Sequence, residues 1–244
     1  MIRFGIDLPN FGPFSDPFVV MPSADLEQAA RTAVTARVLN NGQSCIAAKR
    51  FIVHEQVFDA FAYRFTRALQ TLVIGDPMDP RTQLGPLATA QLRDELAQQV
   101  TRTVQLGGHV LTGGQPLERA GWYYAPTALT DIPPGSPAAD EELFGPVASL
   151  FRARDLDHAI ELANATRFGL GASAWTTDAR EQRRFIDELQ AGLVFINSMV
   201  ASDPRLPFGG VKASGYGREL DVVGLREFLN IKSVSISDEA TLVE

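Results

Sequence analysis

The stretch NNGQSCIAAKRFIV, residues 40–53, joins two segments of different periodicity. Before it, residues 23–39 carry apolar side chains at helical spacing, with Ser23 as the candidate N-cap. Asn40–Asn41–Gly42 is typical of a helix end, and the β-prone run RFIVH follows at 50–54. The stretch therefore predicts the end of a helix, a polar turn and then a strand.

The same alternation continues along the chain. Helices are expected over 88–106, 155–165 and 178–190 and around Phe58, Phe61, Phe65 and Leu69. Strands are expected near 122–130, 146–152, 172–176 and 193–197, with a terminal strand at 231–236 before a polar tail at 237–244. Alternating strands and helices favour an α/β fold with a largely parallel sheet and flanking helices.

Composition narrows the classes of function. Hydrophobic residues make up 45% and charged residues 21% of the 244, which is typical of a folded globular chain. The net charge of −7 and the lack of a dense Lys/Arg cluster argue against nucleic acid as a partner. No apolar run approaches the roughly 20 residues that span a bilayer, so no membrane association and a cytoplasmic location are expected. One cysteine excludes an internal disulfide and a cysteine-based metal site, and no metal is expected.

That single cysteine, Cys45, is the candidate nucleophile. A lone cysteine is more often a small buried apolar residue. Here glycine, asparagine and glutamine precede it, and a turn that presents backbone N–H groups can lower a thiol pKa and hold an oxyanion. The residues alone leave both interpretations open.

The stretch 40–53 resembles the active-site segment of the aldehyde dehydrogenase superfamily. Further motifs agree in order and spacing: GDP at 75–77, LGP at 84–86, EELFGPV at 141–147, FIN at 195–197 and PFGGVKASGYGREL at 207–220. The resemblance covers residues 15–236 as the catalytic, C-terminal half of such an enzyme. It is strongest to bacterial succinate-semialdehyde dehydrogenases, which implies a small aldehyde, succinate semialdehyde first, as the substrate.

The resemblance implies roles for particular residues. The Cys45 thiolate attacks the aldehyde and forms a thioester after hydride transfer to NAD or NADP. Glu142 binds the nicotinamide ribose, and Phe144 packs beside the nicotinamide. Ser202, Arg205 and Asn197 are the candidate substrate-binding residues, although Arg205 could be a surface residue and Asn197 a loop-capping amide. Lys49, Arg50 and His54 are interpreted as ordinary surface or structural residues.

The sequence also departs from the family. Residues 1–14 are a non-family stretch, and Phe11–Phe14 stand where the family has the Glu-Leu-Gly-Gly segment of its general base. The family's cofactor domain has no counterpart in this sequence, so impaired cofactor binding and little standalone activity are expected. The alternatives are a non-catalytic remnant or oligomerising module, which forms a homo-oligomer through 231–236, and a cofactor-free thiol hydrolase that uses Cys45.

Overall fold

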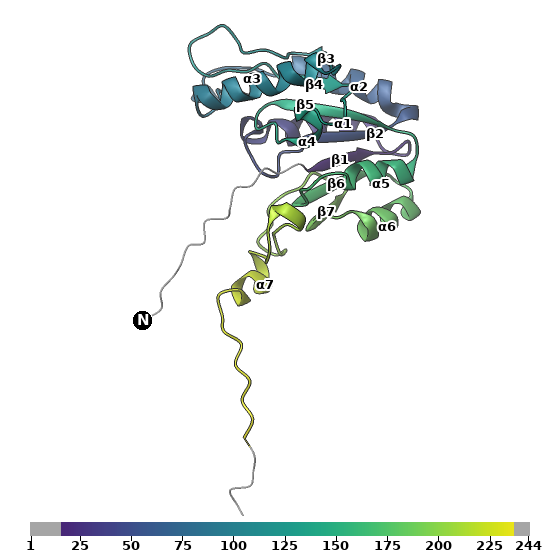
Figure 1. Ribbon diagram of the computed structural model, residues 1–244, viewed down its shortest axis with the longest axis vertical. Coiled ribbons are helices and arrows are strands. Elements are labelled where there is room, and N and C mark those ends of the chain that lie inside the picture. Colours follow the sequence, from purple (N-terminus) through teal and green to yellow (C-terminus); the bar gives the residue numbers. More distant parts are fainter. Residues whose placement is uncertain (1–15, 237–244) are drawn as a thin grey trace, which may run out of the picture.

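The computed structural model describes residues 16–236, which form a seven-stranded sheet flanked by helices (Figure 1). The strand order is β3-β4-β5-β2-β1-β6-β7, and neighbouring strands are parallel except for the antiparallel β3–β4 pair. The largely parallel α/β sheet expected from the sequence is confirmed. The strands are β1 (Pro17–Val20), β2 (Arg50–His54), β3 (His109–Thr112), β4 (Thr127–Thr130), β5 (Val147–Ala153), β6 (Gly171–Trp175) and β7 (Leu193–Ile196).

The helices connect these strands along the chain. They are α1 (Leu26–Val38), α2 (Glu55–Gln70), α3 (Ala90–Gln105), α4 (Pro137–Asp140), α5 (Leu156–Asn164), α6 (Ala179–Glu188) and α7 (Asp221–Arg226), with 3-10 turns at Leu39–Gly42 and Lys212–Ser214. None of the helices within 16–236 combines the length and apolar character needed to cross a bilayer.

The two central strands, β1 and β2, bury both of their faces. Phe18 and Phe51 pack with α1 and α2 on one face of the sheet. Val19 and Ile52 point to the other face and pack with α5 and α6. Successive residues of a strand point to opposite faces, so a strand covered on both sides needs a continuous apolar run. The runs FVV and FIV meet that requirement, and the strand order places β1 and β2 in the middle of the sheet.

Several local expectations need correction. Asp25, not Ser23, caps α1, because its carboxylate accepts from the backbone N–H groups of Glu27 and Gln28. Ser23 instead accepts from the Thr177 N–H at 2.9 Å and ties the end of β1 to the end of β6. The strand expected at 122–130 begins only at residue 127, and β1 and β3 were not anticipated.

The terminal strand expected at 231–236 is wrong for the single chain. These residues form no strand and lead away from the sheet beyond α7 (Figure 1). A strand needs a neighbouring edge for its backbone hydrogen bonds, and this segment has none in the described part of the chain. Its apolar side chains are exposed, with Ile231 at 96%. Residues 1–14, including Phe11–Phe14, and the tail 237–244 lie outside the described residues.

Candidate active site

The Cys45 segment begins where α1 ends. Asn40 and Asn41 take left-handed φ angles of 50° and 59°, and Gly42 follows with φ 76°. A Cβ on Gly42 would lie 2.3 Å from the Gly145 carbonyl oxygen, so this close approach of two backbones requires glycine. The turn therefore presses the Cys45 segment against the segment that precedes β5.

Arg37, a residue of α1, stabilises the contact between the Cys45 segment and the segment before β5. Its guanidinium is fully buried and donates from Nη2 to the Gly42 carbonyl at 2.8 Å and from Nη1 to the Val147 carbonyl at 3.1 Å. Burial lowers the pKa of Arg37 to about 9, against the opposing charges of Glu142 and Asp16. The side chain thus joins the turn before Cys45 to β5 with two hydrogen bonds away from solvent.

The Cys45 thiol is half-buried at the amino end of β2. Burial raises its pKa, and the Asp16 carboxylate adds to the rise. The Lys49 charge and the backbone N–H groups of Ile46 and Cys45 oppose it. Those N–H groups favour negative charge on the sulfur, but burial outweighs them, so the pKa of the thiol is raised and not lowered as the turn alone suggested. Cys45 packs in one apolar cluster with Leu170, Leu193, Phe195 and Phe208.

Lys49 is the main functional candidate that sequence reasoning missed. It was interpreted as a surface or structural residue, yet it is only 3% exposed. Its Nζ donates to the carbonyls of Ser44, Cys45 and Ala47 at 3.2, 3.4 and 3.0 Å. The same atom lies 3.1 Å from Glu142 Oε1. The only sequence signal was its place beside Ile46–Ala48, an apolar stretch leading into a buried strand.

The Glu141–Glu142 pair divides between surface and interior. Glu141 pairs with Arg102 on the surface, whereas the Glu142 side chain is only 12% exposed and faces Lys49. Glu142 Oε1 is buried, and its contact with Lys49 is an ion pair at 3.1 Å. The Phe144 ring centroid lies 6.0 Å from Lys49 Nζ. The structure thus brings Cys45, Glu142 and Phe144 together around one ammonium group.

Asp16 is a second residue that sequence reasoning did not select. It directly precedes β1 and is 1% exposed. Its Oδ1 accepts from the Gly171 N–H at 3.0 Å, while Oδ2 is buried with no partner among residues 16–236. Burial raises the pKa of Asp16 to about 7, opposed first by the charge of Lys49. A carboxyl that can change its charge near neutral pH is therefore part of the cluster.

Asn197 lies at the opposite end of the sheet from Cys45. It follows the carboxyl end of β7, whereas Cys45 precedes the amino end of β2 in the same parallel sheet. Its Oδ1 accepts from the Thr176 N–H and its Nδ2 donates to the Thr176 carbonyl, both at 2.9 Å. These bonds occupy both ends of the amide, and this geometry favours loop capping over substrate contact.

Ser202 and Arg205 lie on the exposed segment that returns from β7 toward Phe208. The Arg205 guanidinium is 86% exposed and makes two bonds to the Asp203 carboxylate, from Nε at 2.9 Å and from Nη2 at 2.6 Å. The structure therefore places them outside the Lys49 cluster.

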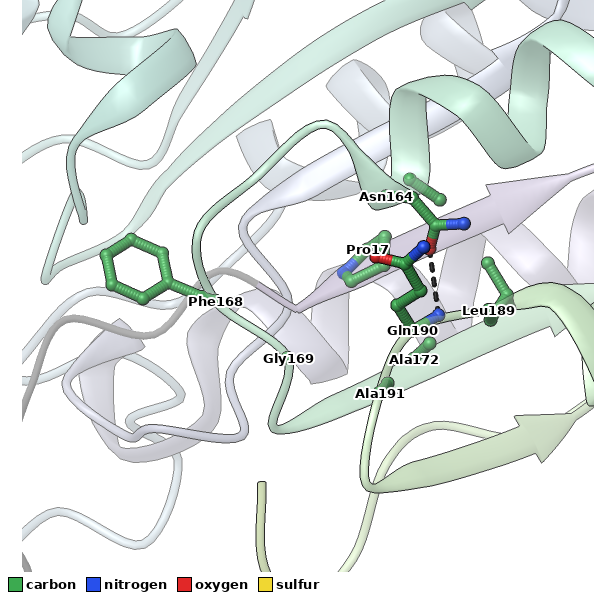
Figure 2. A pocket seen from close by; sticks show the side chains of 9 residues that line it. Pro17, Asn164, Phe168, Gly169, Ala172, Leu189, Gln190 and Ala191 are labelled. Atoms are coloured by element: carbon green, nitrogen blue, oxygen red, sulfur yellow. Dashed lines mark hydrogen bonds between the residues drawn. The ribbon is translucent and has the colours of Figure 1, made fainter. Parts of the chain in front are cut away.

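A small pocket lies beside the start of β1 (Figure 2). It lies between Pro17, the end of α5 and the Gln190–Ala191 turn, and Asn164 Oδ1 accepts from the Gln190 N–H across it at 2.8 Å. Asn164 Nδ2 also donates to the Glu188 carbonyl at 2.9 Å, so Asn164 fixes the turn that follows α6. Neither Cys45 nor Glu142 lines the pocket, and the reactive groups gather elsewhere.

Fold and site together define a class: an α/β domain that presents one cysteine beside a buried lysine and carboxylate at the amino ends of parallel strands. The sequence model described as the aldehyde dehydrogenase family matches residues 15–234. The chain belongs to the aldehyde dehydrogenase family.

Named relatives narrow the comparison. The chain is 61% identical over 220 residues to the NADP(+) succinate-semialdehyde dehydrogenase 1 of Mycobacterium ulcerans (strain Agy99), covering 90% of this chain and 48% of that protein. It is 60% identical to the succinate-semialdehyde dehydrogenase of Mycobacterium avium (strain 104), over 91% of this chain and 47% of that protein. The chain thus spans about half the length of the curated relatives it matches.

Solved structures agree with the sequence relatives. The succinic semialdehyde dehydrogenase from Streptococcus pyogenes, solved in complex with NADP+, superimposes with a TM-score of 0.89 at 34% identity, covering 93% of this chain and 50% of that one. The Burkholderia pseudomallei succinate-semialdehyde dehydrogenase superimposes with a TM-score of 0.85 at 36% identity, over 88% of this chain and 45% of that one.

Proposed function

We propose that residues 15–236 are the catalytic part of an NADP+-dependent succinate-semialdehyde dehydrogenase, with Cys45 as the nucleophile. The observation that carries this proposal is the convergence of the Cys45 segment and Glu142 on one ammonium group, at 3.4 Å and 3.1 Å. The names of the sequence relatives support the choice of substrate and of NADP+.

The chemistry assigned to Cys45 proceeds through a covalent adduct. The thiolate sulfur bonds to the aldehyde carbon while the carbonyl π electrons move to oxygen, and we assign the stabilisation of that oxygen to the backbone N–H of Cys45. NADP+, when bound, supplies the acceptor for the hydride that leaves this carbon. The carbon is then a thioester, and water breaks its C–S bond to release the acid and return the thiol.

Two residues fit the role of holding the cofactor. The Glu142 carboxylate is paired with Lys49 through Oε1 at 3.1 Å, and a carboxylate can accept further hydrogen bonds, here from a ribose hydroxyl. The half-buried Phe144 ring offers an apolar face beside it. A carboxylate next to an aromatic ring suits a nicotinamide ribose, and we assign both residues to cofactor binding.

The carboxylate end of succinate semialdehyde needs a cation and a hydroxyl, and we assign these to Arg205 and Ser202. Arg205 now pairs with Asp203, so substrate binding exchanges one carboxylate for another. Arg205→Met is expected to raise KM for succinate semialdehyde while leaving KM for an uncharged aldehyde within about twofold. Equal changes for both aldehydes would remove Arg205 from the proposal.

A chimera gives the decisive test. Residues 15–234 replace the matching segment of the Mycobacterium ulcerans relative, and NADPH formation with succinate semialdehyde is followed by absorbance. The chimera is expected to turn over and to lose activity on Cys45→Ala. A folded chimera that binds NADP+ without turnover contradicts the proposal.

We also propose that the chain self-associates through its C-terminal segment. Leu225, Phe228, Ile231 and Val234 expose between 65% and 96% of their surface, more than single chains usually leave in water. Sedimentation of the 244-residue chain is expected to show a dimer or larger species, and Phe228→Lys with Ile231→Lys is expected to shift it toward the monomer. A monomer at all concentrations would remove this proposal.

A further inference from the structure

The Lys49 ammonium group is surrounded by acceptors. Its three N–H donors face the carbonyl oxygens of Ser44, Cys45 and Ala47 and the Oε1 atom of Glu142, all within 3.4 Å. The side chain is 4% exposed, so water does not screen these contacts. One buried cation is therefore shared between the turn that carries the thiol and the carboxylate assigned to the ribose.

We propose that Lys49 is a positioning residue for Cys45 chemistry: its ammonium group fixes the Cys45 turn against Glu142, and its positive charge favours the thiolate. This inference rests on the proposed role of Cys45 as the nucleophile. It assigns to Lys49 an effect on the thiol that is separate from the anchoring of the turn.

The charged groups around the Cys45 thiol show which of them favour the thiolate and which disfavour it. Asp16, before β1, is the carboxylate that disfavours the thiolate, and Lys49 is the cation that favours it. Arg37, in α1, disfavours the charge of Lys49, whereas Glu142, before β5, and Asp16 favour it. On the β6–β7 side, the apolar residues Leu170, Leu193 and Phe195 pack in the same cluster as Cys45. Lys49 is thus the cation that acts on the thiol from within the cluster.

A purely structural role is the alternative, and the chain contains a matched example of it. Lys212 Nζ donates to the carbonyls of Asn164 and Thr166 at 2.9 and 3.1 Å and is also partly buried. Lys212 is not among the charges that shift Cys45. Removing Lys212 therefore removes the anchoring of carbonyls by a lysine without removing a charge beside the thiol.

The experiment measures alkylation of Cys45 by iodoacetamide in the 244-residue chain against pH. Because Cys45 is the only cysteine, the rate reports one thiol, and Cys45→Ala provides the blank. Lys49→Met is expected to move the midpoint of the profile to higher pH and to lower the rate constant at pH 7.5 about tenfold, with the limiting rate at high pH within about twofold. Lys212→Met is expected to leave the profile unchanged, and Lys49→Arg to restore most of the rate. A folded Lys49→Met chain with an unchanged midpoint overturns the proposal.

If Lys49→Met does not fold, two further variants test whether the Lys49 charge favours the Cys45 thiolate. Lys49→Gln keeps amide donors for the carbonyls and removes the charge, so the same upward shift is expected. Glu142→Gln removes one of the two carboxylates that act on Lys49, so faster alkylation at pH 7.5 supports the proposal and an unchanged profile overturns it. A chimera without turnover would instead contradict the proposed function, whatever the difference between these profiles.

Discussion

The Asp16 carboxylate accepts a hydrogen bond from the Gly171 N–H at 3.0 Å and joins the amino ends of β1 and β6. Its second oxygen, Oδ2, is buried with no partner in the described chain. A buried carboxylate with one oxygen left without a partner is costly to ionise, and burial accordingly raises the pKa of Asp16 to about 7, although Lys49 opposes the rise. The joint between the two strands therefore depends on pH.

The sign of that dependence follows from the raised pKa. Between the ordinary carboxyl pKa of 3.8 and the folded value of about 7, the folded chain binds a proton that the unfolded chain has lost. The stability that Asp16 contributes is fully present below pH 3.8 and is lost as the pH rises through 7. Asp16→Asn keeps the acceptor for Gly171 and removes the charge. We expect the free energy of unfolding of this variant, relative to the unchanged chain, to rise by a few kcal/mol from pH 5 to pH 8, on the order given by linkage.

Urea unfolding at both pH values measures this difference. Asp59→Asn is the control, since Asp59 is an exposed carboxylate, at 87%, that pairs with Arg152. A relative stability of Asp16→Asn that stays constant or falls with pH would show that the buried carboxyl remains ionised.

Patterns in a short stretch of sequence predicted the elements that depend on residues adjacent in the chain. The apolar run at 50–54 predicted both ends of β2 correctly, because a short apolar run between a turn and an amphipathic helix is compatible with few structures other than a strand. β1 was not anticipated because its four residues carry no periodicity of their own and are defined by pairing with β2 and β6. Ser23 was selected over Asp25 as the cap because both residue types suit that position.

The residues of the candidate site also fall into two groups, those that a local motif predicted and those that it did not. Resemblance located Cys45, Glu142 and Phe144, since each lies in a contiguous motif. Lys49 and Asp16 were missed because their burial comes from segments remote in sequence, around Glu142 and Gly171 respectively. A charged residue is expected at the surface unless its partner is known, and no single-sequence pattern names that partner.

The Gly42 turn offers a test of backbone contact. Gly42 and Gly135 have nearly equal φ angles, 76° and 78°, but a Cβ meets the Gly145 carbonyl at 2.3 Å in the first and nothing within 4 Å in the second. Gly135→Ala is expected to cost about 1 kcal/mol of unfolding free energy from the left-handed φ alone. Gly42→Ala is expected to cost roughly 3 kcal/mol or more, because two backbones must also separate. Equal losses in thermal or urea unfolding would mean that the contact with Gly145 can relax freely.

Arg37 provides a test of the joint between α1 and β5. Arg37→Met keeps the length of the side chain but leaves the carbonyls of Gly42 and Val147 without their donors. We expect a loss of about 3 kcal/mol in unfolding free energy, as is usual when buried polar groups lose a charged partner. Arg64→Met is the control, because Arg64 is 41% exposed, donates to the Ala60 carbonyl of its own helix and makes only a solvent-exposed ion pair with Glu27 at 3.6 Å. A loss no larger than that of the control would show that water replaces the guanidinium.

Substitutions at Asn197 distinguish a loop-capping role from a role in substrate binding. Asn197→Ala removes both bonds to the Thr176 backbone and leaves a left-handed residue, with φ 54°, that alanine adopts at a cost. We expect the unfolding free energy to fall by roughly 2 kcal/mol. In the chimera, KM for succinate semialdehyde is expected to stay within about twofold, because Asn197 and Cys45 lie at opposite ends of the sheet. Asn197→Asp retains the acceptor for the Thr176 N–H but loses the donor, so its stability should lie between those of alanine and asparagine. A large rise in KM with little loss of stability would instead assign the Asn197 amide to the substrate.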